Sequence, residues 1–206
     1  MRPNTIDIDV ADASLTGFRS NITGAGPWVP TTTTPTDGLA HQISIRNDSV
    51  TDYSGQTFTA VGTDANGKAI SEAITGPGNG ATVESTLYYK TYTLLTASGA
   101  GISTDTFDLG WVDEVASITY PIDFYSPYAC AIQVDVTGTI DFTVQETFVN
   151  VLTGDAAIWS NISALASKTA DTASVATIGA TAIRVIVNSY SSGAELQMYT
   201  SQPSCD

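Results

Sequence analysis

The chain has 206 residues, of which 14% are charged and 42% hydrophobic, and its formal net charge is −14 at pH 7. Only seven residues are Lys or Arg, too few for a surface that follows nucleic-acid phosphates or binds an anionic membrane, so we expect neither nucleic acid nor membrane as a partner. The length suits one large all-β domain or two small ones, and no apolar run approaches the roughly 18 residues of a membrane span.

The first segment, residues 1–36, is predicted to be an extended N-terminal arm. A strand-like run, TIDIDV, precedes the run GAGPWVPTTTTPTDG, in which three prolines prevent a regular strand or helix. The opening MRPNTIDIDV lacks the apolar core of a signal peptide, so no secretion signal is expected. Trp28 stands between prolines without a core of its own, and we expect it to enter a pocket on this subunit or a neighbour.

We expect contacts with another chain, rather than the domains that follow, to order this arm. An extended segment can add TIDIDV as a strand to an exposed sheet edge and place an aromatic anchor beyond it. The alternative is that the arm folds back over its own first domain and covers a sheet edge. The candidate interface residues are Ile6, Ile8, Val10, Arg19, Trp28 and Val29.

Residues 37–114 are predicted to form a first β domain. Its candidate strands are LAHQISIRN, QTFTAVGT, KAISEAIT, TLYYKTYTLLTAS and DTFDLGWVDE. Turn signals separate them about every 8 to 15 residues, which is typical of a sandwich or barrel.

The second and third of these strands are predicted to form a hairpin around Asn66 and Gly67. Apolar and polar residues alternate on both sides of this pair, which is the period of a strand. Asn-Gly is typical of a type I′ turn, in which both residues have positive φ. The GPGNG run that follows is predicted to be a loop, because Pro77 has no amide donor.

Residues 115–206 are predicted to form a second β domain, with the boundary near residues 114–121. Its candidate strands are ASITYPI, ACAIQVDVTG, IDFTVQETFVNV, ATAIRVIVNSY and AELQMYTSQ. The best helical window, residues 156–170, has no strong caps, so we expect helix in less than about 15% of residues. The prediction is therefore an all-β chain of two consecutive antiparallel β-sandwich or barrel-like domains.

Two cysteines, Cys130 and Cys205, are too few for a disulfide framework. Cys130 lies in the apolar run ACAIQV and is expected to be a small buried hydrophobic residue.

No residue pattern in the chain requires a catalytic, cofactor-binding or metal-binding site. His41 is the single histidine and is expected to be structural. The run DANG resembles the front of a calcium loop but lacks the later Glu that such a loop needs. Paired carboxylates can serve a glycosidase, but we interpret the acidic residues near the end of the first domain as edge and loop residues: Asp105, Asp108, Asp113 and Glu114. We therefore predict no enzyme, no cofactor and no metal.

One long stretch resembles a β module of virion structural proteins from tailed bacteriophages. The resemblance covers residues 39–114 and rests on a strand ending near ISI, the run FTAVGTDANGKAISEAITGP, an aromatic strand and a closing FDLGW. The downstream run TAIRVIVNSYSSGAELQMY is similar to the second β domain that often follows. Such proteins serve as capsid decoration (cement) proteins, head fibres or tail components.

The resemblance implies a non-enzymatic decoration protein, made in the host cytoplasm and placed on the outer surface of the virion capsid. It would bind the major capsid protein and bridge neighbouring subunits, as a homotrimer that matches the three-fold positions of the lattice. A protein that binds the assembled shell and not its dissociated parts stabilises the shell. The alternative is a head-fibre or tail component that contacts host-surface glycans through aromatic loops, and a depolymerase ranks behind both.

Overall fold

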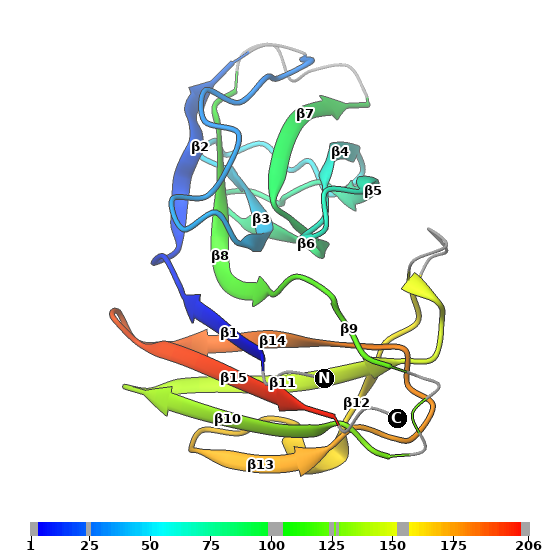
Figure 1. Cartoon of the computed structure of the whole chain (residues 1–206). Helices are drawn as coiled ribbons and strands as arrows, with labels where there is room; N and C mark the ends of the chain where they lie inside the picture. The colour runs from blue at the N-terminus through cyan, green and yellow to red at the C-terminus, as the bar shows by residue number, and fades with distance from the viewer. Residues whose placement is uncertain are drawn as a thin grey trace. The chain divides into compact units, whose positions relative to one another are not determined.

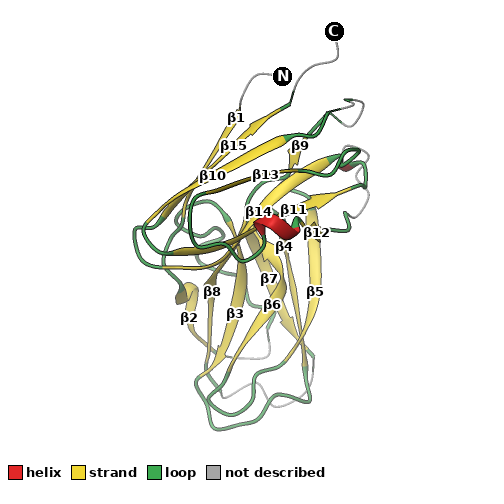
Figure 2. Ribbon diagram, turned by 90° about the horizontal axis from the view of Figure 1, so that it is seen from below, coloured by secondary structure: helices red, strands yellow, loops and turns green. Residues whose placement is uncertain are grey.

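A computed structural model describes residues 4–23, 26–98, 105–123, 126, 128–151 and 157–202, and its strands are labelled in Figure 1. The regular elements among these residues are β-strands and short 3-10 turns, and no α-helix occurs among them. The 3-10 turn Ser163–Leu165 lies beside β12 and is red in Figure 2. The all-β prediction is confirmed. Within the described part of the chain, no helix is long and apolar enough to cross a membrane.

The chain divides into two compact units. We call residues 11–115 the central unit and residues 1–10 with 116–206 the terminal unit. The chain thus starts in the terminal unit, leaves it to build the central unit, and returns after Val115, within the predicted boundary. The prediction of a separate arm over residues 1–36 is wrong, because these residues are shared between the two units.

The central unit consists of two sheets. The larger has the order β2-β8-β3-β6, and the smaller has the order β5-β4-β7. The strands are β2 (Ser14–Ile22), β3 (Ala40–Asn47), β4 (Thr57–Thr63), β5 (Ala69–Thr75), β6 (Thr82–Tyr89), β7 (Thr91–Ala97) and β8 (Phe107–Ala116). The predicted strand TLYYKTYTLLTAS is two strands, because the chain turns at Lys90 between β6 and β7.

The predicted hairpin is present as β4 and β5, which pair from Thr57 opposite Thr75 to Thr63 opposite Ala69. The predicted type I′ turn is wrong, because Gly67 has positive φ (81°) and Asn66 does not. The carboxylate of Asp64 sets the turn instead: its Oδ1 accepts the amides of Asn66 and Lys68, each at 2.9 Å. The aspartate that resembled a calcium ligand is thus engaged by its own loop.

Aromatic side chains fill the core of the central unit. The rings of Trp28 and Phe107 lie 5.1 Å apart, and those of Phe18 and Trp111 lie 5.0 Å apart. Phe58 adds a ring 5.8 Å from Trp28. Tilted and edge-on pairs of this kind stabilise a core beyond their buried area.

Residues 28–33 cover the free edge of β7. Trp28 and Leu95 exchange amide-to-carbonyl bonds of 2.8 and 3.0 Å, and the Tyr92 amide donates to the Thr33 carbonyl at 2.8 Å. The amide of Thr31 then donates to the carbonyl of Phe18 on β2 at 2.9 Å. The proline-rich segment therefore covers a sheet edge of its own domain, which was the second of the two predicted alternatives.

On the other side of the small sheet, Glu72 joins β5 to β6. Its Oε1 accepts the amide and the hydroxyl of Thr86, both at 2.8 Å, and its Oε2 accepts the amide of Leu87 at 3.1 Å. Both edges of the small sheet are thereby connected to the large one, as in a barrel.

The terminal unit is a sandwich of two sheets. One has the order β1-β15-β10-β13, and the other has the order β12-β11-β14 with β9 also paired to β14. The strands are β1 (Asn4–Asp9), β9 (Tyr120–Pro121), β10 (Ala131–Thr137), β11 (Ile140–Thr147), β12 (Ser160–Asn161), β13 (Thr172–Val175), β14 (Ala182–Tyr190) and β15 (Glu195–Ser201). Cys130, just before β10, is buried as predicted.

Candidate functional site

Three predicted interface residues, Ile6, Ile8 and Val10, are buried in the terminal unit. On β1, Ile6 lies opposite Met198 and Ile8 opposite Leu196 of β15. Strand alternation turns these apolar side chains inward and the intervening Asp7 outward. The prediction that TIDIDV forms an attachment surface for another chain is therefore wrong in this structure.

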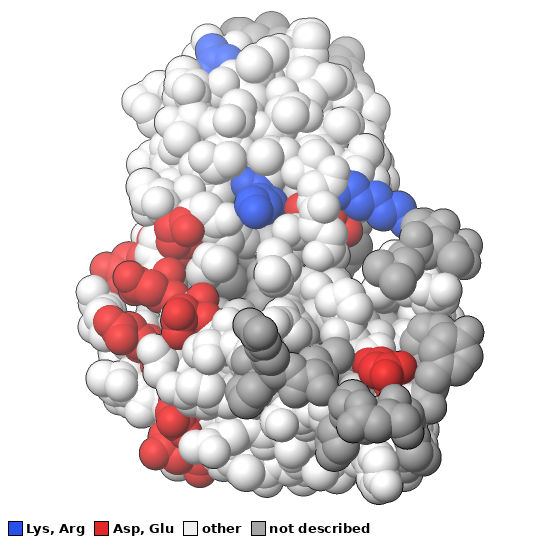
Figure 3. All heavy atoms as spheres, viewed as in Figure 1, with Lys and Arg blue, Asp and Glu red and all other residues white. Residues whose placement is uncertain are grey.

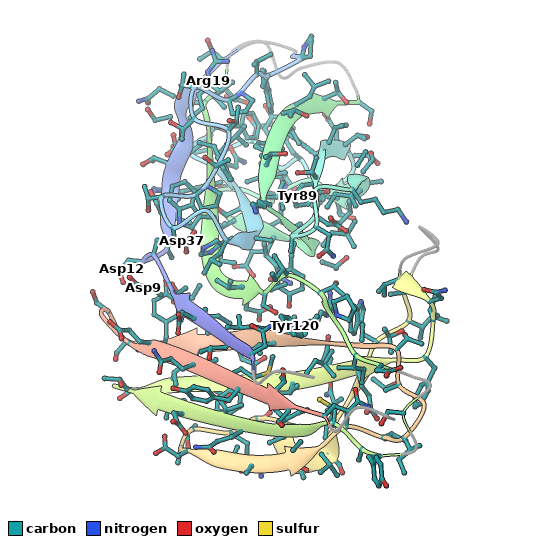
Figure 4. The ribbon with its side chains drawn as sticks, viewed as in Figure 1. Asp9, Asp12, Arg19, Asp37, Tyr89 and Tyr120 are labelled. Atoms are coloured by element: carbon teal, nitrogen blue, oxygen red, sulfur yellow. The ribbon has the colours of Figure 1, made fainter. Side chains whose placement is uncertain are left out.

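The remaining predicted interface residues lie in the central unit. Trp28 is only 3% exposed, so it docks on its own subunit. Arg19, labelled on β2 in Figure 4, donates from Nη1 to the carbonyl of Val29 at 2.8 Å. Of the six predicted residues, only Val29 presents an exposed apolar side chain.

His41 is buried and has a structural role, as predicted. Its Nδ1 lies 2.7 Å from the Val112 carbonyl and its Nε2 lies 2.7 Å from Oδ2 of Asp37. Since both partners are acceptors, an imidazolium with a proton on each nitrogen satisfies both bonds. Burial raises the pKa of Asp37, but bonds from His41 and from the Ala11 amide outweigh it and hold that pKa below its ordinary value.

The acidic residues near β8 serve local structure. Tyr53 donates its hydroxyl to Asp105, which lowers the pKa of that carboxyl. Asp108 accepts the amide of Asn21 at 2.9 Å. No group of three or more His, Cys, Asp or Glu side chains among the described residues could hold a metal ion.

Exposed apolar side chains gather at one end of the terminal unit, which we call the apolar end. There β10 and β14 begin while β11 and β13 end. Five large side chains are more than half exposed at this end: Tyr128 (55%), Phe148 (56%), Ile158 (77%), Val175 (53%) and Ile178 (62%).

Hydrogen bonds fix the backbone of the apolar end. The amide and hydroxyl of Thr177 donate to the carboxylate of Glu146 at 2.7 and 2.6 Å, which holds the chain after β13 against the end of β11. The amide of Ala176 donates to the carbonyl of Cys130 at 2.9 Å. Ser160 lies opposite Glu146, so the chain just before β12 runs beside the chain just after β11.

The opposite end of the terminal unit, which carries the β14–β15 turn, is acidic. Figure 3 shows Asp and Glu side chains gathered over it. Asp9 lies directly opposite Glu195, and Asp7 and Asp135 flank Gln197 from either side. Like charges placed opposite each other across strands repel. The two ends of this unit therefore differ in chemistry: one carries exposed apolar side chains, and the other carries closely spaced carboxylates.

The tryptophan rings offer little exposed surface for the predicted contact with glycans. Trp28 and Trp111 are buried, and Nε1 of Trp111 donates to the Asp12 carbonyl at 3.1 Å. Trp159 is half-buried, with the Arg184 guanidinium 4.4 Å from its ring centroid.

The sequence did not reveal the apolar end. Its five residues lie in runs such as ETFVNV and TASVATIGA, where the pattern is equally consistent with a buried and with an exposed apolar side chain. The available signal was weak: four of the five lie just before or just after a strand, and only Val175 lies in one.

Comparisons with known proteins add little. No protein family matches the chain, and no curated protein matches it in sequence. A solved structure of infectious bursal disease virus, Gx strain, aligns over 96% of this chain and 70% of its own, with 13% identity and a TM-score of 0.21. A likeness at this level carries no argument about the fold or function of this chain.

Proposed function

We propose that this chain is a non-enzymatic structural protein of a tailed-phage virion, which binds the outer surface of the capsid and bridges major capsid subunits. The observation that supports it best is the apolar end of the terminal unit. Several large, exposed apolar side chains at one end of a domain are typical of protein interfaces. The sequence resemblance of residues 39–114 to virion β modules favours the capsid as the partner.

The chemistry of the apolar end suits docking on a protein shell. Glu146, one of the carboxylates at this end, is buried and bound by Thr177. A partner surface that covers this end therefore does not have to strip water from the Glu146 carboxylate. Attachment as a homotrimer would multiply a modest contact, because the second and third contacts become intramolecular.

Co-sedimentation with particles stripped of this protein tests the attachment. Phe148→Ser combined with Ile178→Ser should weaken binding by about 2–4 kcal/mol, since each side chain loses roughly 1–2 kcal/mol of burial. Val50→Ser, at an 84% exposed apolar residue of the central unit, is the matched control and should bind normally. Equal binding by the double variant and the wild type would contradict attachment through the apolar end.

Stabilisation of the shell is tested separately. Stripped particles should burst more readily under heat, chelation or osmotic shock, and adding the protein back should reverse this. Unchanged survival in all three treatments would contradict a cementing role. Antibody labelling distinguishes the alternative: label over the whole shell supports decoration, and label confined to the tail or to single fibres supports the host-contact function.

A further inference from the structure

Sheet edges in this chain are mostly protected against pairing with other strands. An edge strand exposes unpaired amides and carbonyls, and proteins commonly cover such edges or guard them with charges. In the central unit, residues 28–33 cover β7, and Glu72 ties β5 to β6. In the terminal unit, β1 exposes two acidic side chains, Asp7 and Asp9, and β12 has only two residues.

β13 is an edge strand with no strand on its outer side in the described structure, although the 3-10 turn Ser163–Leu165 lies near it. Its four residues, TASV, include no charge and no proline, and β10 is its strand partner in the described structure. The amide of Ala176 donates to Cys130 of the neighbouring segment. Because antiparallel bonding alternates along a strand, Thr172 and Ser174 also face β10, while the backbone groups of Ala173 and Val175 face outward.

The four residues of this edge carry no charge, and the edge joins the apolar end. Val175 belongs to both β13 and the apolar end. On the exposed face, Ala131 lies opposite Val175, and Gln133 lies opposite Ala173. The acidic side chains of this sheet lie on β1, on β15 and toward the other end of β10, where Asp171, directly before β13, accepts the amide of Val136 at 2.8 Å. A strand added along β13 would therefore meet no carboxylate beside Ala173 or Val175.

We propose that an extended segment of the partner pairs with β13 as an added strand of the sheet, with apolar side chains at alternate positions that continue onto the apolar end. Main-chain bonds would supply affinity, and the alternating side chains would supply specificity. The inference rests on the proposed function, and it specifies the kind of partner segment that binds beside the apolar end. A second copy of the chain fits less well, because each copy carries a net charge of −14 and pairing through β13 would join two acidic sheets.

Substitutions at Ala173 test this pairing on stripped particles. Ala173→Pro removes an outward amide without removing a bond to β10, and edge strands tolerate proline. Ala173→Thr keeps the amide and is the matched control. We expect Ala173→Pro to weaken binding at least tenfold, and Ala173→Thr to bind as the wild type does. Equal binding by both variants would overturn the inference.

Hydrogen exchange provides a second measurement that does not depend on a variant. In the wild-type protein bound to particles, the amides of Ala173 and Val175 should exchange at least tenfold more slowly than in the free protein. Unchanged exchange at these amides in a protein that binds particles would overturn the inference even if Ala173→Pro fails to fold. A different result would contradict the proposed function: the wild-type protein itself would not bind the particles.

Discussion

The central and terminal units differ in how the edges of their β-sheets are covered. In the central unit, a loop segment and one carboxylate connect the small sheet to the large one on both sides. In the terminal unit, the sandwich keeps an uncharged edge at β13 and an apolar end beside it. A unit with covered sheet edges offers no backbone groups for pairing with another strand, whereas a unit with an open, uncharged edge strand can pair with a strand of a partner. We infer from the difference that attachment falls to the terminal unit.

The order of the chain reinforces this contrast. The terminal unit takes its first strand from residues 4–9 and the rest from residues after Val115, so the central unit is an insertion between them. The central unit itself depends on residues that sequence analysis placed in an arm. Truncations and substitutions can therefore separate the two units.

Deletion of residues 1–36 should have the largest effect. It removes β2 with Phe18, Trp28 and the cover of β7 from the central unit, as well as β1 from the terminal unit. We expect the central unit to lose its fold, seen as loss of aromatic near-ultraviolet circular dichroism. Deletion of residues 1–10 is the matched comparison and should destabilise the terminal unit alone. A folded central unit after the longer deletion would show that the segment is dispensable, as an independent arm would be.

Trp28→Ala should destabilise the central unit by about 3–5 kcal/mol, since it leaves a cavity among Phe58 and Phe107. Denaturant unfolding followed by circular dichroism measures this loss. Trp159→Ala, at a half-buried residue of the terminal unit, is the control and should cost clearly less. A loss in Trp28→Ala as small as that expected for Trp159→Ala would contradict a stabilising role of Trp28 in the core.

Asp37→Asn should cost about 2 kcal/mol, because it removes the charged acceptor that His41 and the Ala11 amide share. The pKa of Asp37 is lowered in the folded state, so its contribution is present above the unfolded value of about 3.8 and is lost as the pH falls through the folded pKa. The wild type should therefore lose this stability below about pH 4, and the variant should not. Parallel pH profiles of the two unfolding free energies would contradict this assignment.

The sequence predicted the regular strands well, because local alternation decides them. Strands such as β4, β5 and β14 alternate in sequence, and they appear close to the predicted bounds. β2 was missed because its pairing with β8 is irregular, with register shifts on both sides of Arg19. Its Gly17 is also needed for close packing, since a Cβ there would overlap the ring of Trp111.

The arm and the candidate site were beyond local sequence signals. Prolines predict an extended backbone, but they carry no information about what the segment packs against, and here the contacts are with β2 and β7 of its own unit. Likewise, β1 finds β15 at the far end of the chain. Exposure of Phe148 or Ile178 also depends on such long-range packing, so periodicity does not separate an exposed apolar residue from a buried one.

The smallest predicted effect concerns the β4–β5 turn and sharpens the claim that the core, rather than the turns, stabilises the central unit. Gly67 has a φ of 81°, where an L-residue is strained, while a Cβ added there would meet no atom within 4 Å. Gly67→Ala should therefore cost about 1 kcal/mol through backbone strain alone. Gly55 has equally open surroundings without a positive φ, so Gly55→Ala should be neutral or slightly stabilising. Equal effects of the two variants in denaturant unfolding would mean that backbone strain at Gly67 does not determine the stability of this turn. If Gly67→Ala instead cost nearly as much as Trp28→Ala, the turn would be as important to the central unit as its core.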